Sequence, residues 1–146
     1  MQADRNMMVY QKLADLVLKL EKRTAEGLVD WRATDVPEKF HAGFGRYSIA
    51  ILRTPGMGAG GTAYQIAVFN ANKQQIECFA DDALSDFRHP NGSFHASMRN
   101  IHETAQRIAL GSEHAINAIL SVLDDDQAIR EINRAILEIN GAGGRT

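Results

Sequence analysis

The sequence has one cysteine, Cys78, among its 146 residues. A single thiol excludes an internal disulfide framework and a zinc site built from several cysteines. It also fits a reducing compartment, where thiols stay unpaired. Cys78 falls in a predicted strand, and we expect a small, buried or half-buried side chain there rather than a reactive nucleophile.

Long hydrophobic runs are also missing. No stretch approaches the roughly 20 apolar residues that a membrane-spanning helix needs. Charged residues interrupt the N-terminal segment, which therefore lacks the apolar stretch of a secretory signal. We expect a cytoplasmic protein with no membrane partner.

Neither sign of charge is in excess. The chain has 16 basic and 18 acidic residues, a formal net charge of −2, and no basic arm or acidic tail. Because nucleic-acid-binding domains are usually basic, we expect no nucleic-acid partner. The length and the 45% hydrophobic content are typical of one globular domain. We predict a single domain over residues 1–140 and a flexible tail over residues 141–146.

Apolar residues recur every three or four positions in four segments, which predicts four helices. The first helix covers residues 4–26, and Gly27 is placed to cap its C-terminal end in the left-handed conformation. Ser112 is the predicted N-cap of the third helix. The apolar stripes of the last three helices are Met98, Ile101, Ala105 and Ile108; then Ala115, Ile116, Ile119, Leu120 and Leu123; then Ile129, Ile132, Ile136 and Ile139.

The middle of the chain alternates with a period of two, as strands do. Gly45 suits the first central position of a two-residue type II′ turn, which would pair Phe44 with Tyr47. A second hairpin follows, in which either Phe79 or the pair Ile76 and Cys78 faces the core. The order predicts an α+β fold: an N-terminal helix, a three- to five-stranded antiparallel meander, and two to three C-terminal helices packed on one sheet face.

Two short motifs carry a resemblance. Thr24, Gly27 and Trp31 form a Thr-x-x-Gly-x-x-x-Trp segment after the first helix. A later Ala-x-Arg-x-Ala-Leu-Gly segment consists of Ala105, Arg107, Ala109, Leu110 and Gly111. In these features the chain resembles a group of small uncharacterised bacterial and mobile-element α+β proteins. The resemblance spans about residues 13–123 and implies the same order of elements, without implying an activity.

The segment RTPGMGAGGTAY, residues 53–64, places Gly56, Gly58 and Gly61 in a G-x-G-x-x-G spacing. A dinucleotide-binding fingerprint needs a helix after the glycines, because the pyrophosphate binds at the helix N-terminus. A predicted strand follows here, so we interpret the segment as a hairpin connection. Its glycine amides could still wrap an anion. The candidate ligand-binding residues are Arg46, Arg53, Gly56, Gly58, Gly60, Gly61 and Tyr64.

No complete catalytic constellation is recognisable in the sequence. His95 and His102 are seven residues apart, whereas helical metal sites usually place histidines four apart. We therefore expect a polar helix edge there, with no metal and no cofactor. The acidic clusters at residues 81–82 and 124–126 stand at predicted helix starts, where capping accounts for them.

The outer face of the predicted sheet carries small residues, which permit close approach of another layer. The helices also have more apolar surface than one sheet face needs. Together these features predict a homo-oligomer, with a dimer as the expected state. The candidate interface is Ile129, Ile132, Ile136 and Ile139; the alternative is that this stripe completes the core of the monomer.

Our leading interpretation is a non-enzymatic cytoplasmic binding or interaction module, homo-oligomeric, which meets its partner or ligand near the glycine loop. The first alternative is a phage or mobile-element protein that sequesters a small anionic nucleotide-like ligand. The second is a small hydrolase that uses His41 or His102. His41 and His89 have no partner nearby in the sequence.

Overall fold

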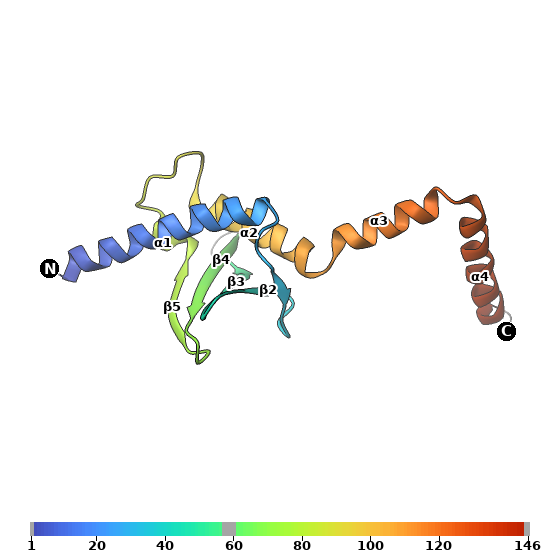
Figure 1. Ribbon diagram of the computed structural model, residues 1–146, viewed down its shortest axis with the longest axis horizontal. Helices are drawn as coiled ribbons and strands as arrows, with labels where there is room; N and C mark the ends of the chain where they lie inside the picture. Colours follow the sequence, from blue (N-terminus) through green and yellow to red (C-terminus); the bar gives the residue numbers. More distant parts are fainter. Residues whose placement is uncertain (1, 57–60, 145–146) are drawn as a thin grey trace. The chain divides into compact units, whose positions relative to one another are not determined.

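The computed structural model describes the backbone of residues 2–56 and 61–144, and the side chains of residues 7–56 and 61–139 (Figure 1). It divides into two compact units, Met1–Leu110 and Gly111–Thr146. The single domain predicted over 1–140 stays a prediction beside this division. The first unit contains α1 (Gln2–Ala25), β1 (Arg32–Ala33), β2 (Lys39–Phe44), β3 (Tyr47–Pro55), β4 (Thr62–Phe69), β5 (Gln75–Ala80), the 3₁₀ turn η1 (Asp81–Leu84) and α2 (Phe94–Ala109). The second contains α3 (Ser112–Leu123) and α4 (Asp126–Gly144).

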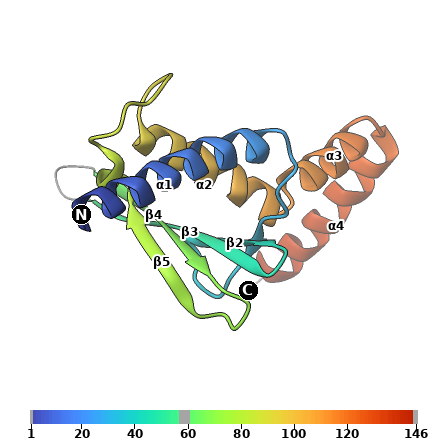
Figure 2. The same ribbon diagram turned by 60° about the vertical axis from the view of Figure 1, so that its left-hand side comes forward.

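The five strands form one antiparallel sheet in the order β1-β2-β3-β4-β5. Figures 1 and 2 show α1 and α2 on one side of this sheet, and α2 contacts β1 to β4 while α1 packs against α2. The predicted α+β fold is therefore confirmed: a helix, a meander with the full five strands, and then three helices.

The first hairpin has the predicted register. Phe44 pairs with Tyr47, and Gly45 between them has a φ of 67°, which a type II′ turn requires at this position. Phe44 and Tyr47 lie at the end of the sheet and are exposed. The apolar row then passes into the core through Phe40, Ala42, Ile49 and Ile51.

In the second hairpin the structure selects Phe79 as the inward residue. Phe79 is buried and pairs with the fully buried Ile66 of β4. Ile76 and Cys78 point the other way and are exposed. The prediction of a buried or half-buried Cys78 is therefore wrong. Cys78 lies on the outer face of β5, which is an edge strand and has a neighbour on one side only.

The Thr-x-x-Gly-x-x-x-Trp spacing has a structural reason. The amide of Leu28 donates to the carbonyl of Arg23 and that of Gly27 to Thr24, both at 3.0 Å, so α1 ends in a Schellman motif. Gly27 supplies the left-handed φ of 76° that this turn needs. The chain then returns along the helix, and the buried Trp31 donates from Nε1 to the buried Oγ1 of Thr24 at 3.1 Å.

The second unit is a pair of helices with capped starts. Gly111, with φ 68°, stands at the N-cap of α3, and Ser112 is the first helical residue. The predicted Ser112 cap is thus wrong by one residue, because the left-handed glycine both ends α2 and begins α3. Asp125 accepts hydrogen bonds from the amides of Gln127 and Ala128, which confirms the capping interpretation of this acidic cluster.

The helix α4 continues to Gly144, past residue 141, where the predicted tail begins. Among the helices in the described part of the chain, none is both long enough and apolar enough to cross a membrane.

Candidate functional site

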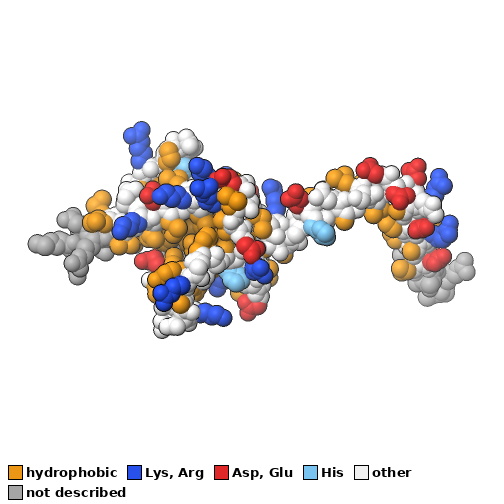
Figure 3. Space-filling model, in the orientation of Figure 1, with side chains coloured by type: hydrophobic (Ala, Val, Ile, Leu, Met, Phe, Trp, Pro, Cys, Tyr) orange, Lys and Arg blue, Asp and Glu red, His pale blue; other side chains and the backbone are white. Residues whose placement is uncertain are grey.

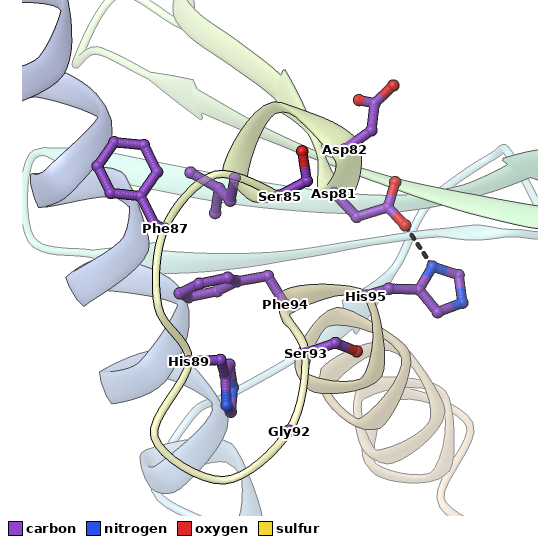
Figure 4. Close-up of a pocket in the computed structure, with 10 residues that line it drawn as sticks. Asp81, Asp82, Ser85, Phe87, His89, Gly92, Ser93, Phe94 and His95 are labelled. Atoms are coloured by element: carbon purple, nitrogen blue, oxygen red, sulfur yellow. Dashed lines mark hydrogen bonds and ion pairs between the residues drawn. The ribbon is translucent and has the colours of Figure 1, made fainter.

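A hollow of about 370 Å³ lies beside η1, between the segment 85–93 and the first turn of α2 (Figure 4). Its base is formed by the buried side chains of Leu84 and Phe94. Ligand sites are typically apolar hollows of this size with a few polar groups at the rim. The polar lining residues are Asp81, Asp82, Ser85, His89, Ser93 and His95.

At the rim, Asp81 accepts a hydrogen bond from Nδ1 of His95. The Asp81 side chain is only 11% exposed, whereas that of His95 is 41% exposed. A carboxylate at Nδ1 leaves Nε2 as the accepting nitrogen, which is the arrangement of a general base. Figure 4 shows the imidazole of His95 turned away from Phe94 and the base of the hollow. Asp81 therefore orients a histidine; it does not cap η1 as its position in the sequence predicts.

A second polar cluster joins the segment 85–93 to α1 and α2. Nδ1 of His89 accepts from the amide of Asn91 at 3.0 Å, so the proton lies on Nε2, which donates to Oγ of Ser97 at 2.7 Å. Ser97 in turn donates to Glu21 at 2.8 Å, and Asn100 donates to the other carboxylate oxygen at 2.9 Å. The cluster borders a second hollow of about 540 Å³. Sequence reasoning missed it, because Glu21 and Ser97 are 76 residues apart.

Replacement of Ser97 by alanine is expected to cost about 1–3 kcal/mol of unfolding free energy. Ser97 is buried, and its loss leaves Nε2 of His89 without an acceptor and leaves Glu21 with one donor, Asn100, in place of two. Urea unfolding followed by circular dichroism measures the loss. Ser85→Ala, at an exposed position on the same segment, is the control and should change the value by less than about 0.5 kcal/mol. Equal effects of the two changes would contradict the assigned role of Ser97.

A third cluster lies where β3 and β4 reach the glycine loop. His102 is 1% exposed, and its Nε2 donates to the carbonyl of Glu38 at 2.7 Å. Arg53 binds the Glu38 carboxylate with two nitrogens: Nη2 lies 3.1 Å from Oε1 and Nε 3.0 Å from Oε2. The buried Tyr64 packs against His95 and His102, with ring centroids 5.3 and 5.6 Å apart.

Among the candidate ligand-binding side chains, Arg53 and Tyr64 belong to cross-strand partners of β3 and β4, whereas Arg46 lies apart from both. Arg53 lies at the loop end of β3 in its ion pair with Glu38. Arg46 lies in the turn before β3, at the opposite end of this nine-residue strand. Tyr64 contributes its ring to the core. An anionic ligand at this loop, and a hydrolase that uses His41 or His102, stay predictions.

Gly56 and Gly61, the two described glycines of the loop, are hydrogen-bonded to each other where the loop leaves β3 and enters β4. The amide of Gly56 donates to the carbonyl of Gly61 at 2.8 Å, which extends the β3–β4 ladder by one step. Gly58 and Gly60 lie outside the described residues. A Cβ at Gly56 would lie 3.0 Å from the backbone carbons of Gly61 and Thr62. The close approach of the two strands therefore accounts for the glycine at position 56.

We expect Gly56→Ala to destabilise the first unit by about 1–3 kcal/mol, because the backbone of β4 must shift to admit the methyl group. Gly43→Ala is a matched control in β2, where no atom lies within 4 Å of an added Cβ. That change should be neutral or slightly stabilising, since alanine has less backbone entropy to lose than glycine. Thermal unfolding of the two variants tests the difference, and equal midpoints would contradict the close contact.

The outer sheet face carries small side chains, as the sequence predicts. One cross-strand row runs through His41, Ala50, Ala67 and Cys78, which pair in sequence across β2 to β5. His41 is exposed on this outer face, whereas its neighbour Phe40 faces the core and packs against His102.

The two helices of the second unit, α3 and α4, expose large apolar side chains. No residue of α3 is buried. Half-buried apolar residues occur near the connection between the two helices, at Val122, Ala128 and Ile129. Figure 3 shows hydrophobic side chains on the surface of both helices. The exposed fractions range from 45% to 71% at Ile116, Ile119, Leu120, Leu123, Ile132, Ile136, Leu137 and Ile139.

Of the four predicted interface residues, Ile132, Ile136 and Ile139 are therefore exposed and Ile129 is half-buried.

Comparison of the chain with protein-family models, with curated proteins and with solved structures finds no match in any of the three.

Proposed function

We propose that the chain is a non-enzymatic protein-interaction module and that the helical hairpin α3–α4 is its binding element. The observation that carries the proposal is the exposure of α3. Seven of its twelve residues are apolar, yet none is buried within the chain. A helix with an apolar face this wide is stable in water only when another surface covers that face.

The size of the hairpin supports the same proposal. Below about 40 residues, a chain usually needs disulfides, metals or association to fold. The second unit covers residues 111–146, and helices of 12 and 19 residues are marginal in isolation. Covering eight large, half-exposed side chains would contribute on the order of 10 kcal/mol before the costs of association. A bound partner therefore supplies what the hairpin lacks.

The polar clusters of the first unit support binding rather than catalysis. His89 and His102 hold their protons in hydrogen bonds that tie elements of the fold together. Ser97, the hydroxyl next to His89, is buried and already donates to Glu21. The oriented His95 lines the rim of the hollow, and its ring points away from Phe94 at the base (Figure 4).

The triple variant Ile119→Ser, Ile132→Ser, Ile136→Ser tests the proposal. The unmodified chain should either have a mass above that of a monomer in light scattering or bind an apolar fluorescent dye, because its hairpin surface is either covered or free. The triple variant should lose whichever property the unmodified chain shows. Identical mass and identical dye binding in the two proteins would refute the proposed function.

A further inference from the structure

The isoleucines of α4 follow a heptad pattern. Ile129, Ile132, Ile136 and Ile139 are spaced by three, four and three residues, the spacing of alternating a and d positions. Isoleucine at both positions disfavours a two-stranded coiled coil and favours three or four helices around a common core. One hairpin supplies two helices, and two hairpins supply four.

The residues that flank the isoleucines point to a bundle as well. Ala128 and Ala135 occupy g positions and Asn133 an e position, where two-stranded coiled coils usually carry charged pairs. Small uncharged residues at these positions widen the face that a helix can bury. Asp126, the first residue of α4, is charged and falls at an e position. The charged side chains after it fall at the b, c and f positions, away from this face; they are Arg130, Glu131, Arg134 and Glu138.

Like α4, the helix α3 carries its large apolar residues along one side. Its polar residues His114, Asn117 and Ser121 lie along the opposite side of the helix. Among the apolar side chains described in the two helices, only Val122, Ala128 and Ile129 near the connection are half-buried, so most of the two stripes is left open in a single hairpin. The apolar stripe of α3 consists of Ile116, Ile119, Leu120 and Leu123.

The amount of apolar surface fits one partner of the same kind. The seven large side chains of the two stripes, each 45–71% exposed, offer on the order of 700 Å² per chain, close to what each partner contributes to an interface of standard size. A two-fold symmetric contact between identical hairpins buries the same patch on both sides. The acidic connection, Asp124 to Asp126, would repel its own copy, so the two connections belong at opposite ends.

From these features we infer that the partner of the hairpin is a second copy of this chain. The helices α3 and α4 of two chains form a four-helix bundle, with the isoleucines of α4 in its core and the acidic connections at opposite ends. This inference rests on the proposed function and names the partner of the same surface.

The experiment uses the full chain and three single variants, with mass measured by light scattering and sedimentation at micromolar concentration. The unmodified chain should have the mass of two copies. Ile136→Glu places a charge in the bundle core and should raise the dissociation constant at least about 100-fold. Leu137→Glu adds the same charge at the neighbouring b position and should keep the mass of two.

A third variant, Ile136→Ala, removes bulk from the core while it introduces the best helix former. It should raise the dissociation constant about tenfold or more while keeping the helix content seen by circular dichroism, so a melted α4 cannot account for the result.

Three outcomes would overturn the inference. The first is a monomeric unmodified chain whose dye binding disappears in the triple serine variant; this result leaves the proposed function standing with a different partner. The second is a dimer that Ile136→Glu and Ile136→Ala leave intact, which places the interface elsewhere. The third is equal weakening by Ile136→Glu and Leu137→Glu, which contradicts the orientation of α4 in the bundle.

Discussion

Replacing Trp31 by alanine is expected to lower the unfolding free energy by about 3–5 kcal/mol. Trp31 is 1% exposed and belongs to the core that α1, α2 and the sheet share. Its removal leaves a large cavity and also removes the indole N–H that donates a hydrogen bond to Oγ1 of Thr24. Since domains of this size are stable by only about 5–15 kcal/mol, the loss would bring the first unit near its unfolding limit.

The loss is measured by urea unfolding followed by far-ultraviolet circular dichroism, because Trp31 is the only tryptophan and its fluorescence disappears with it. Leu28→Ala is the control: Leu28 is 66% exposed and should change the free energy by less than about 0.5 kcal/mol. Trp31→Phe keeps an aromatic ring but removes the indole N–H, and it should fall between the two. A loss below about 1 kcal/mol for Trp31→Ala would contradict the role given to this residue.

The second large effect concerns the hairpin. A chain that ends after Ser112 should be a folded monomer, with a thermal midpoint within about 2 °C of that of the first unit in the full chain. The buried core residues in the described part of the chain all lie between Leu13 and Ala105, and the truncated chain retains Gly111, which ends α2. Light scattering and circular dichroism of the two chains make the comparison.

Two results would contradict this prediction. An unfolded truncated chain would mean that the first unit depends on the hairpin for its stability. A truncated chain that still has the mass of two copies would place the contact between copies in the first unit.

The parts of the fold that sequence reasoning predicted well are those governed by local patterns. The alternation of apolar residues and Gly45 in a two-residue turn set the register of the first hairpin, because each constrains neighbours only a few residues away. Gly27 at the end of α1 is a similar case. The resemblance to mobile-element proteins stays a prediction; the spacing of Thr24, Gly27 and Trp31 that carries it serves a structural contact.

The polar clusters could not be predicted in the same way. His95 meets Asp81 only because η1 packs beside the first turn of α2, and Ser97 meets Glu21 only because α2 packs on α1. The exposure of Cys78 is not predictable from the sequence, because the apolar alternation of one strand does not say which face of an edge strand is inward. The partner of Arg53, Glu38, lies 15 residues earlier and depends on the pairing of β2 with β3.

The two candidate sites differ in how far sequence and structure support each other. The glycine loop has a G-x-G-x-x-G spacing in the sequence. In the structure, however, Arg53 and Tyr64 beside it already have partners within the fold. The isoleucine stripe of α4 is a plain periodic pattern, and the structure leaves most of it exposed. An apolar face without a partner is the stronger indication, since its exposure to water carries a free-energy cost that association removes.

Amide hydrogen exchange across α3 in the full chain tests the central claim most directly, with α2 as the internal reference. A 12-residue helix with no buried side chain should exchange rapidly unless another surface covers it. We predict strong protection of the α3 amides at micromolar concentration, lost on dilution and in the Ile136→Glu variant, while α2 stays protected throughout. Exchange of the α3 amides at the rate of an unstructured peptide at every concentration would contradict the account.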